Sequence, residues 1–333
     1  MGRLAARARG GLAVGALLLS LLFPLAALYA GQDYLLSFAA RILAFAIAAT
    51  SLNLILGYGG LVSFGHAAFV GVGAYTLGIL AKEGVRSAWV AWPLSLLAAA
   101  LAALLIGSLA LRTRGIYFIM ITLAFAQMLY YAVVSLRVYG GEDGMAVPRS
   151  LLLPGLGLEN GVLLYYLALA ALGLTLWITH RLVQAPFGWV LQAARDNPSR
   201  AACLGFPVFQ FQLGAFVIAG TMAGMAGVLL ANLNGWVSPS FLSWHLSGQL
   251  MMMVILGGPP PPGGGLWGQG STWFWKPSSP SSPSTGSFSW GCSFLRPCSC
   301  PRGALWAWEG SGEPARCPGD HQEVRRPSGG VPP

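Results

Sequence analysis

The side chains best placed to meet a polar ligand lie in one glycine-rich segment, GYGGLVSFGHAAFVGVGAY, at residues 57–75. Ser63 and His66 can each donate and accept a hydrogen bond. The chemistry they offer is therefore recognition of a polar solute inside an apolar chain. A lone histidine in such a chain can also hydrogen-bond to a neighbouring helix, and the sequence is equally consistent with both uses of His66.

Closely spaced glycines surround these two side chains. Each glycine weakens a helix interior by roughly 1 kcal/mol relative to alanine, so GYGG argues against a continuous helix. Irregular backbone at membrane depth persists only where it is buried in protein or faces a water-filled cavity. We therefore predict a broken or re-entrant segment near residues 57–66 that borders a translocation pathway. The candidate pathway residues are Gly57, Gly59, Gly60, Ser63, Gly65 and His66.

Catalytic and metal chemistry find no support in the sequence. No Ser/His/Asp or zinc-type cluster is present, and the cysteines from residue 292 onward lack the paired C-x2-C spacing of zinc sites. The two lysines, Lys82 and Lys276, are not preceded by the glycine that a phosphate-binding loop requires. We predict no enzyme activity, no catalytic residues, no metal and no cofactor. Any ATP hydrolysis would have to come from a separate polypeptide.

Long apolar runs surround the glycine-rich segment and must position its candidate pathway residues. The chain has 333 residues, of which 55% are hydrophobic and only 9% charged, whereas soluble domains carry about 25% charged residues. Runs of about 20 apolar residues are long enough to cross a bilayer. The sequence predicts an all-α polytopic membrane protein with about seven to eight transmembrane helices. The expected spans are 11–30, 35–56, 61–80, 88–111, 115–135, 161–180 and 207–232, with the start of another at 246–257.

The first span could also be read as a secretory signal, because Arg3, Arg7 and Arg9 precede it. Its length and the spans that follow favour an uncleaved anchor. The net charge of +9 does not indicate nucleic acid, because the basic residues of the apolar region are scattered between spans. Arginine is more frequent in alternate loops, and cytoplasmic loops carry this excess. We expect a cytoplasmic N-terminus and a cytoplasmic loop at residues 181–206.

Small residues form two stripes that would let helices approach closely in lipid. Spacings of four, three and four residues place them on one helical face. The helix-packing candidates are Ala67, Gly71, Ala74 and Gly78 in one span, with Gly220 and Gly224 in another. Helix packing is the expected role of both stripes.

The 181–206 loop is the one long cytoplasmic segment, and it predicts a short helix. Pro186 can open a helix, the glycine of LGF at 204–206 can close one, and Pro198 interrupts the stretch between them. A solvated connector is the simplest interpretation. Its short ARDN cluster, flanked by alanines, also suits a helix that rests on a partner surface.

Composition changes abruptly after Gly258. Residues 259–333 hold 14 of the 22 prolines, six of the 12 tryptophans and four of the five cysteines. A disordered low-complexity extension is one interpretation, but such extensions are poor in Trp and Cys. We therefore expect a disordered, non-native tail that arises from a shifted reading frame and removes the final one or two helices.

Several segments resemble the LivM-type permease subunits of branched-chain amino acid ABC importers, the inner-membrane components of binding-protein-dependent systems. The matching segments are SLNLILGYGGLVSFGHAAFVGVGAY at 51–75, RTRGIYFIMITLAFAQM at 112–128, FGWVLQAARDNPSRAACLG at 187–205, VIAGTMAGMAGVLLA at 217–231 and QLMMMVILGG at 249–258. The resemblance covers about residues 10–258, in order. It implies that residues 1–258 form a transmembrane permease domain.

The resemblance also implies partners. Such permeases work in the inner membrane, surrounded by lipid, with a second LivH-like permease, two cytoplasmic ABC ATPases and a periplasmic amino-acid-binding protein. Leu, Ile or Val would be the solute, and related systems carry other amino acids, amides or urea. The cytoplasmic loop would correspond to the ATPase coupling loop, although Ser199 and Arg200 replace the family's usual Glu and first Ala. The candidate coupling residues are Arg195, Asp196, Asn197, Ala201, Ala202 and Gly205.

Two other function classes stay open. A self-contained secondary transporter or channel would usually place a carboxylate inside the membrane, and no predicted span contains Asp or Glu. A membrane scaffold without transport activity would bind partners but move no solute.

Overall fold

The computed structural model describes residues 33–257 except 86, 154–155 and 158–160. The chain divides into a unit of residues 1–276 and a unit of residues 277–333, and the second unit lies entirely outside the described residues. The predicted span 11–30 and the predicted tail from residue 259 also lie outside them. All described residues belong to the first unit.

The described part of the chain is built almost wholly from helices. This follows from its apolar composition, because a helix satisfies its own backbone hydrogen bonds within lipid. The elements are α2 (Asp33–Asn53), the π-helical turn η1 (Leu54–Tyr58), α3 (His66–Lys82), α4 (Ala88–Ala110), α5 (Ile116–Ser135), the 3-10 turn η2 (Arg137–Tyr139), α6 (Gly161–Gln184), α7 (Pro186–Asp196), α8 (Pro198–Cys203), α9 (Val208–Asn234), the 3-10 turn η3 (Pro239–Leu242) and α10 (Trp244–Gly257). Four short strands, β1 (Met145–Ala146), β2 (Leu151–Leu153), β3 (Leu156–Gly157) and β4 (Trp236–Val237), form two antiparallel pairs, β1 with β4 and β2 with β3.

Five helices in the described residues are long and apolar enough to cross a membrane. They cover Tyr34–Tyr58, Ala88–Ala110, Ile116–Ser135, Gly161–Gln184 and Val208–Asn234. Helix α3 has 17 residues and α10 has 14, so both are shorter than these five. The predicted all-α polytopic membrane fold is confirmed. The helix expected from residue 61 begins at His66, because the preceding glycine-rich stretch is not helical.

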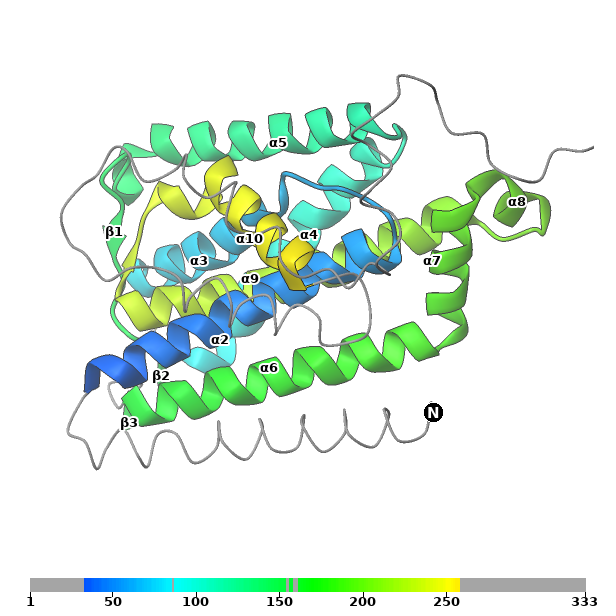
Figure 1. The fold of residues 1–333 in the computed structure, drawn as a ribbon. Helices are drawn as coiled ribbons and strands as arrows, with labels where there is room; N and C mark the ends of the chain where they lie inside the picture. The colour runs from blue at the N-terminus through cyan, green and yellow to red at the C-terminus, as the bar shows by residue number, and fades with distance from the viewer. Residues whose placement is uncertain (1–32, 86, 154–155, 158–160, 258–333) are drawn as a thin grey trace, which may run out of the picture. The chain divides into compact units, whose positions relative to one another are not determined.

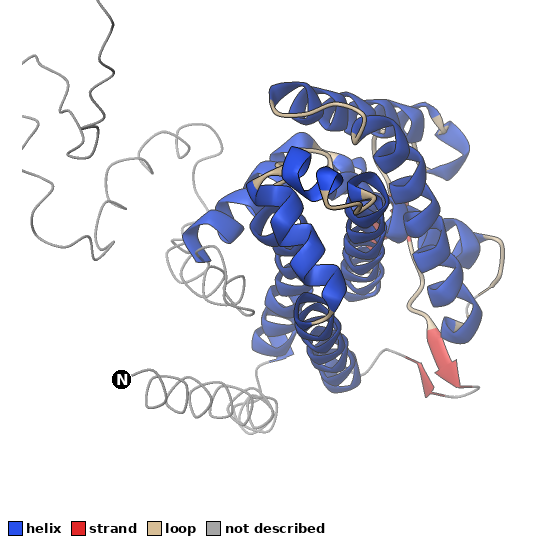
Figure 2. Ribbon diagram, turned by 90° about the vertical axis from the view of Figure 1, so that its right-hand side faces the viewer, coloured by secondary structure: helices blue, strands red, loops and turns tan. Residues whose placement is uncertain are grey.

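Helix α9 lies at the centre of the packing and contacts α2, α3 and α4, while α6 packs on α2. In Figure 1, α5 runs along one side and α6 along the opposite side, with α2, α3 and α9 between them. The turned view in Figure 2 shows several helices closer to end-on, as a bundle with the short strands at one edge. Helix α5 is the least buried of the five long helices, since only 17% of its apolar window is buried within the chain. Its outer face is therefore available to lipid or to another subunit.

Glycines allow α9 to approach its neighbours closely. A Cβ atom on Gly220 would lie 2.5 Å from the Cβ of Ala103 in α4, and one on Gly224 would lie 2.5 Å from the Cβ of Ala99. A Cβ on Gly227 would lie 1.9 Å from the backbone oxygen of Val70 in α3. Close backbone approach of this kind replaces hydrophobic association as the source of helix pairing in lipid.

The small residues of α3 face several different partners. A Cβ on Gly71 would meet the side chain of Leu242 in η3, and one on Gly78 would meet Met145 and Val147. Among the glycines of α3, Gly73 is the one that lies against the α9 backbone, since a Cβ there would lie 2.4 Å from the Gly224 oxygen. The predicted stripe thus contacts loop elements as well as a helix, and Gly73 was missed.

Ala67 and Ala74, the other two residues of that stripe, are fully buried. The Ala67 amide donates to the Ser247 hydroxyl of α10 at 3.0 Å. The Ala74 nitrogen lies 3.1 Å from the position that a Cβ on Gly227 would occupy. Ala67 therefore lies against α10 and Ala74 against α9.

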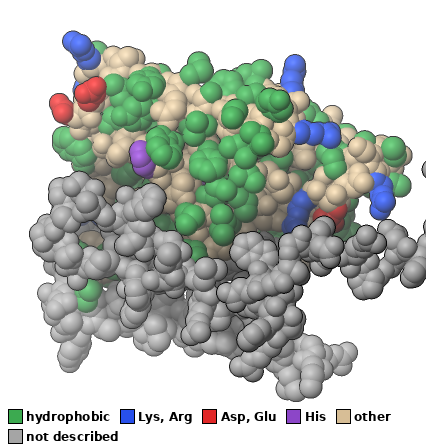
Figure 3. All heavy atoms as spheres, turned by 45° about the horizontal axis from the view of Figure 1, so that its top comes forward, with side chains coloured by type: hydrophobic (Ala, Val, Ile, Leu, Met, Phe, Trp, Pro, Cys, Tyr) green, Lys and Arg blue, Asp and Glu red, His purple; other side chains and the backbone are tan. Residues whose placement is uncertain are grey.

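The two ends of the helix bundle differ in the segments that they contain. At one end, β1 pairs with β4, the Lys82 ammonium donates to the Val138 carbonyl, and Arg41 donates to the Asn234 side chain at 2.8 Å. The other end carries the C-terminal end of α2, the start of α5 and the α7–α8 segment. Figure 3 shows hydrophobic side chains across the middle of one face, with Lys and Arg side chains toward its two ends.

Candidate functional site

The chain is broken between α2 and α3, as predicted. Helix α2 loosens into η1, residues 59–65 are not helical, and Gly60 has a left-handed backbone with φ of +66°. A π-helical turn inside an α-helix is uncommon and is frequent at functional sites. The Leu61 amide donates to the Ile55 carbonyl at 3.1 Å, which closes the end of η1. The break is therefore an ordered element with defined hydrogen bonds.

Three glycines are needed for this geometry. A Cβ on Gly57 would lie 2.4 Å from the Asn53 Oδ1 atom, and one on Gly59 would lie 2.7 Å from the Ile55 carbonyl oxygen. Contacts this short are essentially never seen for a real Cβ: a side chain at Gly57 would require the Asn53 side chain to move, and one at Gly59 would clash with backbone. Gly60 adds a backbone conformation that residues with a Cβ rarely adopt. The GYGG sequence thus coincides with the end of the π-helical turn η1 and the start of the non-helical stretch.

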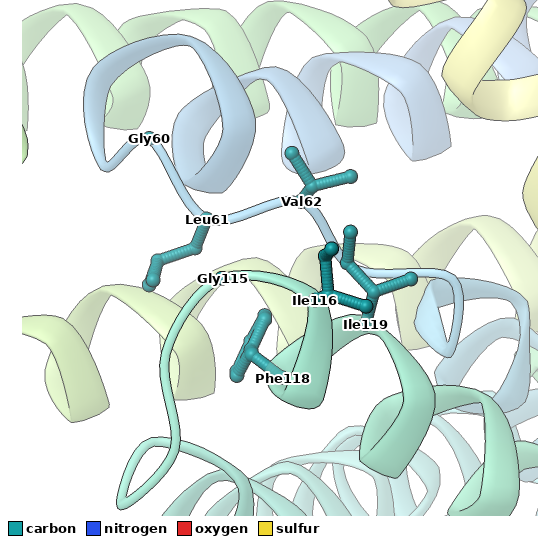
Figure 4. A pocket seen from close by; sticks show the side chains of 7 residues that line it. All are labelled: Gly60, Leu61, Val62, Gly115, Ile116, Phe118 and Ile119. Carbon is teal, nitrogen blue, oxygen red and sulfur yellow. The ribbon is translucent and has the colours of Figure 1, made fainter.

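A pocket of about 220 Å³ lies between the break and the beginning of α5. Figure 4 shows the Gly60–Val62 segment passing over the first turn of α5. The lining residues are Gly60, Leu61 and Val62 from the break, with Gly115, Ile116, Phe118 and Ile119 from α5 and the residue before it. Apart from Gly60, these residues were not predicted as site residues, because apolar residues carry no distinguishing signal in so apolar a chain.

Gly65 sets how closely the break approaches α5. A Cβ at this position would lie 2.5 Å from the backbone oxygen of Thr122 in α5. Because a helix backbone cannot easily give way, any side chain here would push α5 from the break. Gly65 therefore helps to fix the width of the pocket although it does not line it.

His66 and Ser63 are fully buried and do not line the pocket. His66 Nε2 lies 2.8 Å from the Ser51 hydroxyl in α2, and that hydroxyl donates to the Ala48 carbonyl. With the single hydroxyl proton assigned to that carbonyl, His66 Nε2 is the donor to the Ser51 oxygen. The Ser63 hydroxyl accepts from the Gly65 amide at 3.3 Å. In this conformation, the two residues therefore bond to protein.

The His66 assignment leaves one buried acceptor without a partner. Nδ1 of His66 carries the lone pair and has no hydrogen-bond partner. His66 and the pocket are connected through aromatic packing: Phe118 contacts Phe216, Phe216 contacts Phe69, and Phe69 contacts His66, each pair edge-on. The histidine is thus part of the packed wall behind the pocket.

We expect Ser51→Ala to lower the stability of the folded chain by about 1–3 kcal/mol, because it leaves the buried His66 N–H without an acceptor. Ser108→Ala is the matched control, since the exposed Ser108 hydroxyl bonds only to Leu105 in its own helix. Thermal denaturation of the purified chain in detergent measures the difference. Equal melting temperatures for the two variants would show that the Ser51–His66 hydrogen bond contributes nothing.

The α7–α8 segment follows the predicted pattern closely. Helix α7 begins at Pro186, Pro198 begins α8, and Gly205 follows α8 with φ of +86°. The Asn197 side chain accepts the Arg200 amide at 3.0 Å and caps α8. Together, residues 185–206 form what we call the coupling segment, after the role predicted for this loop from the sequence.

One face of the coupling segment packs on the bundle, and the other is open. Leu191 and Ala201 are buried, whereas Trp189 is 71% exposed and Leu204 is 69% exposed. Ala202 is exposed as well, and the Asp196 side chain is 78% exposed. An amphipathic helix with exposed apolar side chains outside the spanning region is suited to contact with another protein.

Arg195 joins the coupling segment to the break. Its Nη1 atom donates to the Gly57 carbonyl of η1 across 138 residues of sequence. The position that a Cβ on Gly60 would occupy lies 2.7 Å from the Arg195 Cγ atom, and the corresponding position on Gly59 lies 3.6 Å from Leu191. Two predicted sites, the break and the cytoplasmic loop, are thus in direct contact.

Within the described residues, no group of three or more His, Cys, Asp or Glu side chains could hold a metal ion. The described arrangement consists of an apolar pocket beside a broken helix, with one arginine bonded to the backbone of the break.

Comparison with known proteins assigns these features to a family. The family described as branched-chain amino acid transport system / permease component matches residues 34–288. High-affinity branched-chain amino acid transport system permease protein LivM of Salmonella typhimurium and the protein of the same name from Escherichia coli are each 30% identical to the chain over 215 residues. These matches cover 56% of the chain and 50% of each relative, so the chain spans about half the length of the curated relatives it matches. No solved structure is significantly similar to it.

Proposed function

The chain belongs to the family of branched-chain amino acid transport system permease components, and we propose that it is the permease subunit of an ABC importer for Leu, Ile or Val. It would form the solute pathway together with a second, LivH-like permease. Two cytoplasmic ATPases would supply the energy, and a periplasmic binding protein would deliver the solute. The chain itself would carry no catalytic residue.

One observation carries this proposal: a broken helix that lines a pocket lies directly against an amphipathic segment with an exposed apolar face. The break supplies irregular backbone beside a hollow, which is how membrane transporters build solute sites. The apolar lining of the pocket suits a branched aliphatic side chain. Gly57, Gly59, Gly60, Ser63, Gly65 and His66 are proposed to form or support the pathway wall.

The end of the bundle that carries the break and the coupling segment is proposed to face the cytoplasm. Arg112, Arg114 and Arg181 flank the ends of helices there, and positive charge is retained on the cytoplasmic side of inner-membrane proteins. Together with the span predicted at residues 11–30, this orientation would put the N-terminus in the cytoplasm as well. The coupling segment would then be open to the ATPases, with Arg195, Asp196, Asn197, Ala201, Ala202 and Gly205 at or near the contact.

Reconstitution with the partner subunits tests the proposal. We expect leucine together with the binding protein to stimulate ATP hydrolysis, and Gly205→Arg to reduce that stimulation by about tenfold, a change of roughly 1.4 kcal/mol. The reason is that Gly205 has φ of +86° on the exposed turn after α8, where a long side chain would be both strained and misplaced.

Gly84→Arg is the matched control for this experiment. Gly84 also has a positive φ, of +91°, and open space around it, but it lies at the opposite end of the bundle. Stimulation should survive this substitution. If Gly205→Arg retained full stimulation, the coupling segment would not be the ATPase contact.

A further inference from the structure

We propose that Arg195 is the positioning residue that links the coupling segment to the wall of the pocket, so that movement of α7 changes the pocket. The inference rests on the proposed function for its biological meaning. The link itself is a feature of the folded chain and can be tested without the partner subunits.

The hydrogen bond from Arg195 falls where the backbone lacks partners. The last carbonyls of a helix have no intrahelical donor, and Gly57 is the next-to-last residue of η1, the turn that ends the helical run begun by α2. An arginine that donates to such a carbonyl satisfies it and places positive charge at the negative end of the helix dipole. Arg195 therefore stabilises the interrupted end of α2 from a different element.

The arginine side chain also contacts the break sterically. Its Cγ atom lies near the space that a Gly60 side chain would fill, with Cβ and Cδ each 3.4 Å from that position. Gly60 is itself a lining residue of the pocket. The Arg195 side chain thus packs against Gly60, which connects η1 to the pocket wall. Its guanidinium group donates a hydrogen bond to the Gly57 carbonyl at the same time.

The other partner available to Arg195 is weaker. The Arg195 Nε atom lies 4.0 Å from a carboxylate oxygen of Asp196, whose side chain is 78% exposed. Exposed ion pairs of this kind contribute little. The bond to Gly57 is therefore the interaction through which Arg195 fixes the position of α7 relative to the break.

This arrangement gives a direct route between two sites. A shift of α7 must either carry the end of α2 with it or break the Arg195–Gly57 hydrogen bond. In the first case Gly60, and with it one wall of the pocket, moves together with α7; in the second case the break loses the hydrogen bond that fixes it. Energetic coupling between the coupling segment and the pocket needs a contact that has two arrangements of different free energy. The intact and the broken Arg195–Gly57 hydrogen bond are two such arrangements.

Hydrogen–deuterium exchange of the purified full chain in lipid nanodiscs tests the link. We expect Arg195→Met to accelerate amide exchange about tenfold or more in peptides covering residues 54–65, because local opening of the break no longer requires loss of the guanidinium bond. Arg195→Lys, which keeps a donor, should give an intermediate rate. Arg181→Met is the matched control, since Arg181 is an exposed arginine at the same end, in the last turn of α6.

Several outcomes would overturn the inference. Unchanged exchange in Arg195→Met would show that the arginine does not hold the break. Faster exchange in α9 as well would show a general folding defect rather than a local link. Equal acceleration of exchange by Arg181→Met and Arg195→Met would show that the loss of a positive charge, and not the loss of the hydrogen bond to Gly57, opens the break.

A second measurement separates positioning from a purely structural role. In the reconstituted importer, Arg195→Met should raise the ATP consumed per leucine transported, whereas a purely structural defect would lower hydrolysis and transport together. An unchanged ratio would contradict transmission through Arg195. If the unsubstituted chain transported nothing, the proposed function would be wrong, and the exchange experiment would still decide whether Arg195 fixes the break.

Discussion

Gly227→Ala is expected to destabilise the chain more than any other single methyl addition at a glycine considered above. The added Cβ would lie 1.9 Å from the Val70 oxygen and 2.8 Å from its carbonyl carbon, both in the backbone of α3. Helix α9 would have to move away from α3, which it contacts extensively. We expect a loss of about 3 kcal/mol or more, as for severe overpacking of a core. Thermal denaturation in detergent measures this as a lower melting temperature.

Gly173→Ala is the control for this prediction. Gly173 also lies inside a membrane-spanning helix, α6, but a Cβ there would meet no atom within 4 Å. Alanine favours a helix over glycine by about 1 kcal/mol, so this variant should be as stable as the natural chain or slightly more so. Similar melting temperatures for Gly227→Ala and Gly173→Ala would mean that α3 and α9 do not pack as described.

Gly60→Ala is expected to reduce leucine uptake by the reconstituted importer about tenfold or more, an effect of roughly 1.4 kcal/mol on the transport cycle. Two effects combine at this position. The left-handed backbone, with φ of +66°, is unfavourable for alanine, and the new methyl group would lie 2.7 Å from the Arg195 Cγ atom. Relief of that contact would displace either Arg195 or the pocket wall.

Gly84→Ala separates backbone strain from the effect on the pocket. Gly84 has φ of +91° and no atom within 4 Å of its Cβ position, so the substitution introduces strain without a clash. Uptake measured at equal amounts of folded protein should be unaffected. If Gly60→Ala and Gly84→Ala transported leucine equally well, the geometry of the break would be irrelevant to transport.

Much of the fold could be predicted because the membrane restricts backbone structure so severely. Apolar runs must form helices there, and three glycines within the four residues of GYGG favour an interruption. The boundaries at Pro186 and Pro198 were also predictable, since proline fits the first turn of a helix and lacks the N–H needed further along. The start of α3 was the main error, because Leu61 and Val62 are apolar enough to suggest that the helix begins there.

The pocket and the Arg195 link could not be read from the sequence for physical reasons. Leu61, Ile116 and Phe118 look like any other apolar side chains until the folded chain places them around a hollow. Arg195 and Gly57 are 138 residues apart, and no local pattern reports a contact between a side chain and a distant backbone carbonyl. Gly73 was missed because small residues occur on several faces of α3, and only packing shows which face approaches α9.

Leucine uptake into proteoliposomes that contain this chain, its partner permease and the ATPases, supplied with binding protein on the outside, tests the central claim most directly. The account predicts uptake that requires ATP inside the vesicles and continues when proton and sodium gradients are abolished. Uptake that is driven by a proton gradient without ATP, and that stops when the gradient is collapsed, would identify a self-contained secondary transporter and contradict the account.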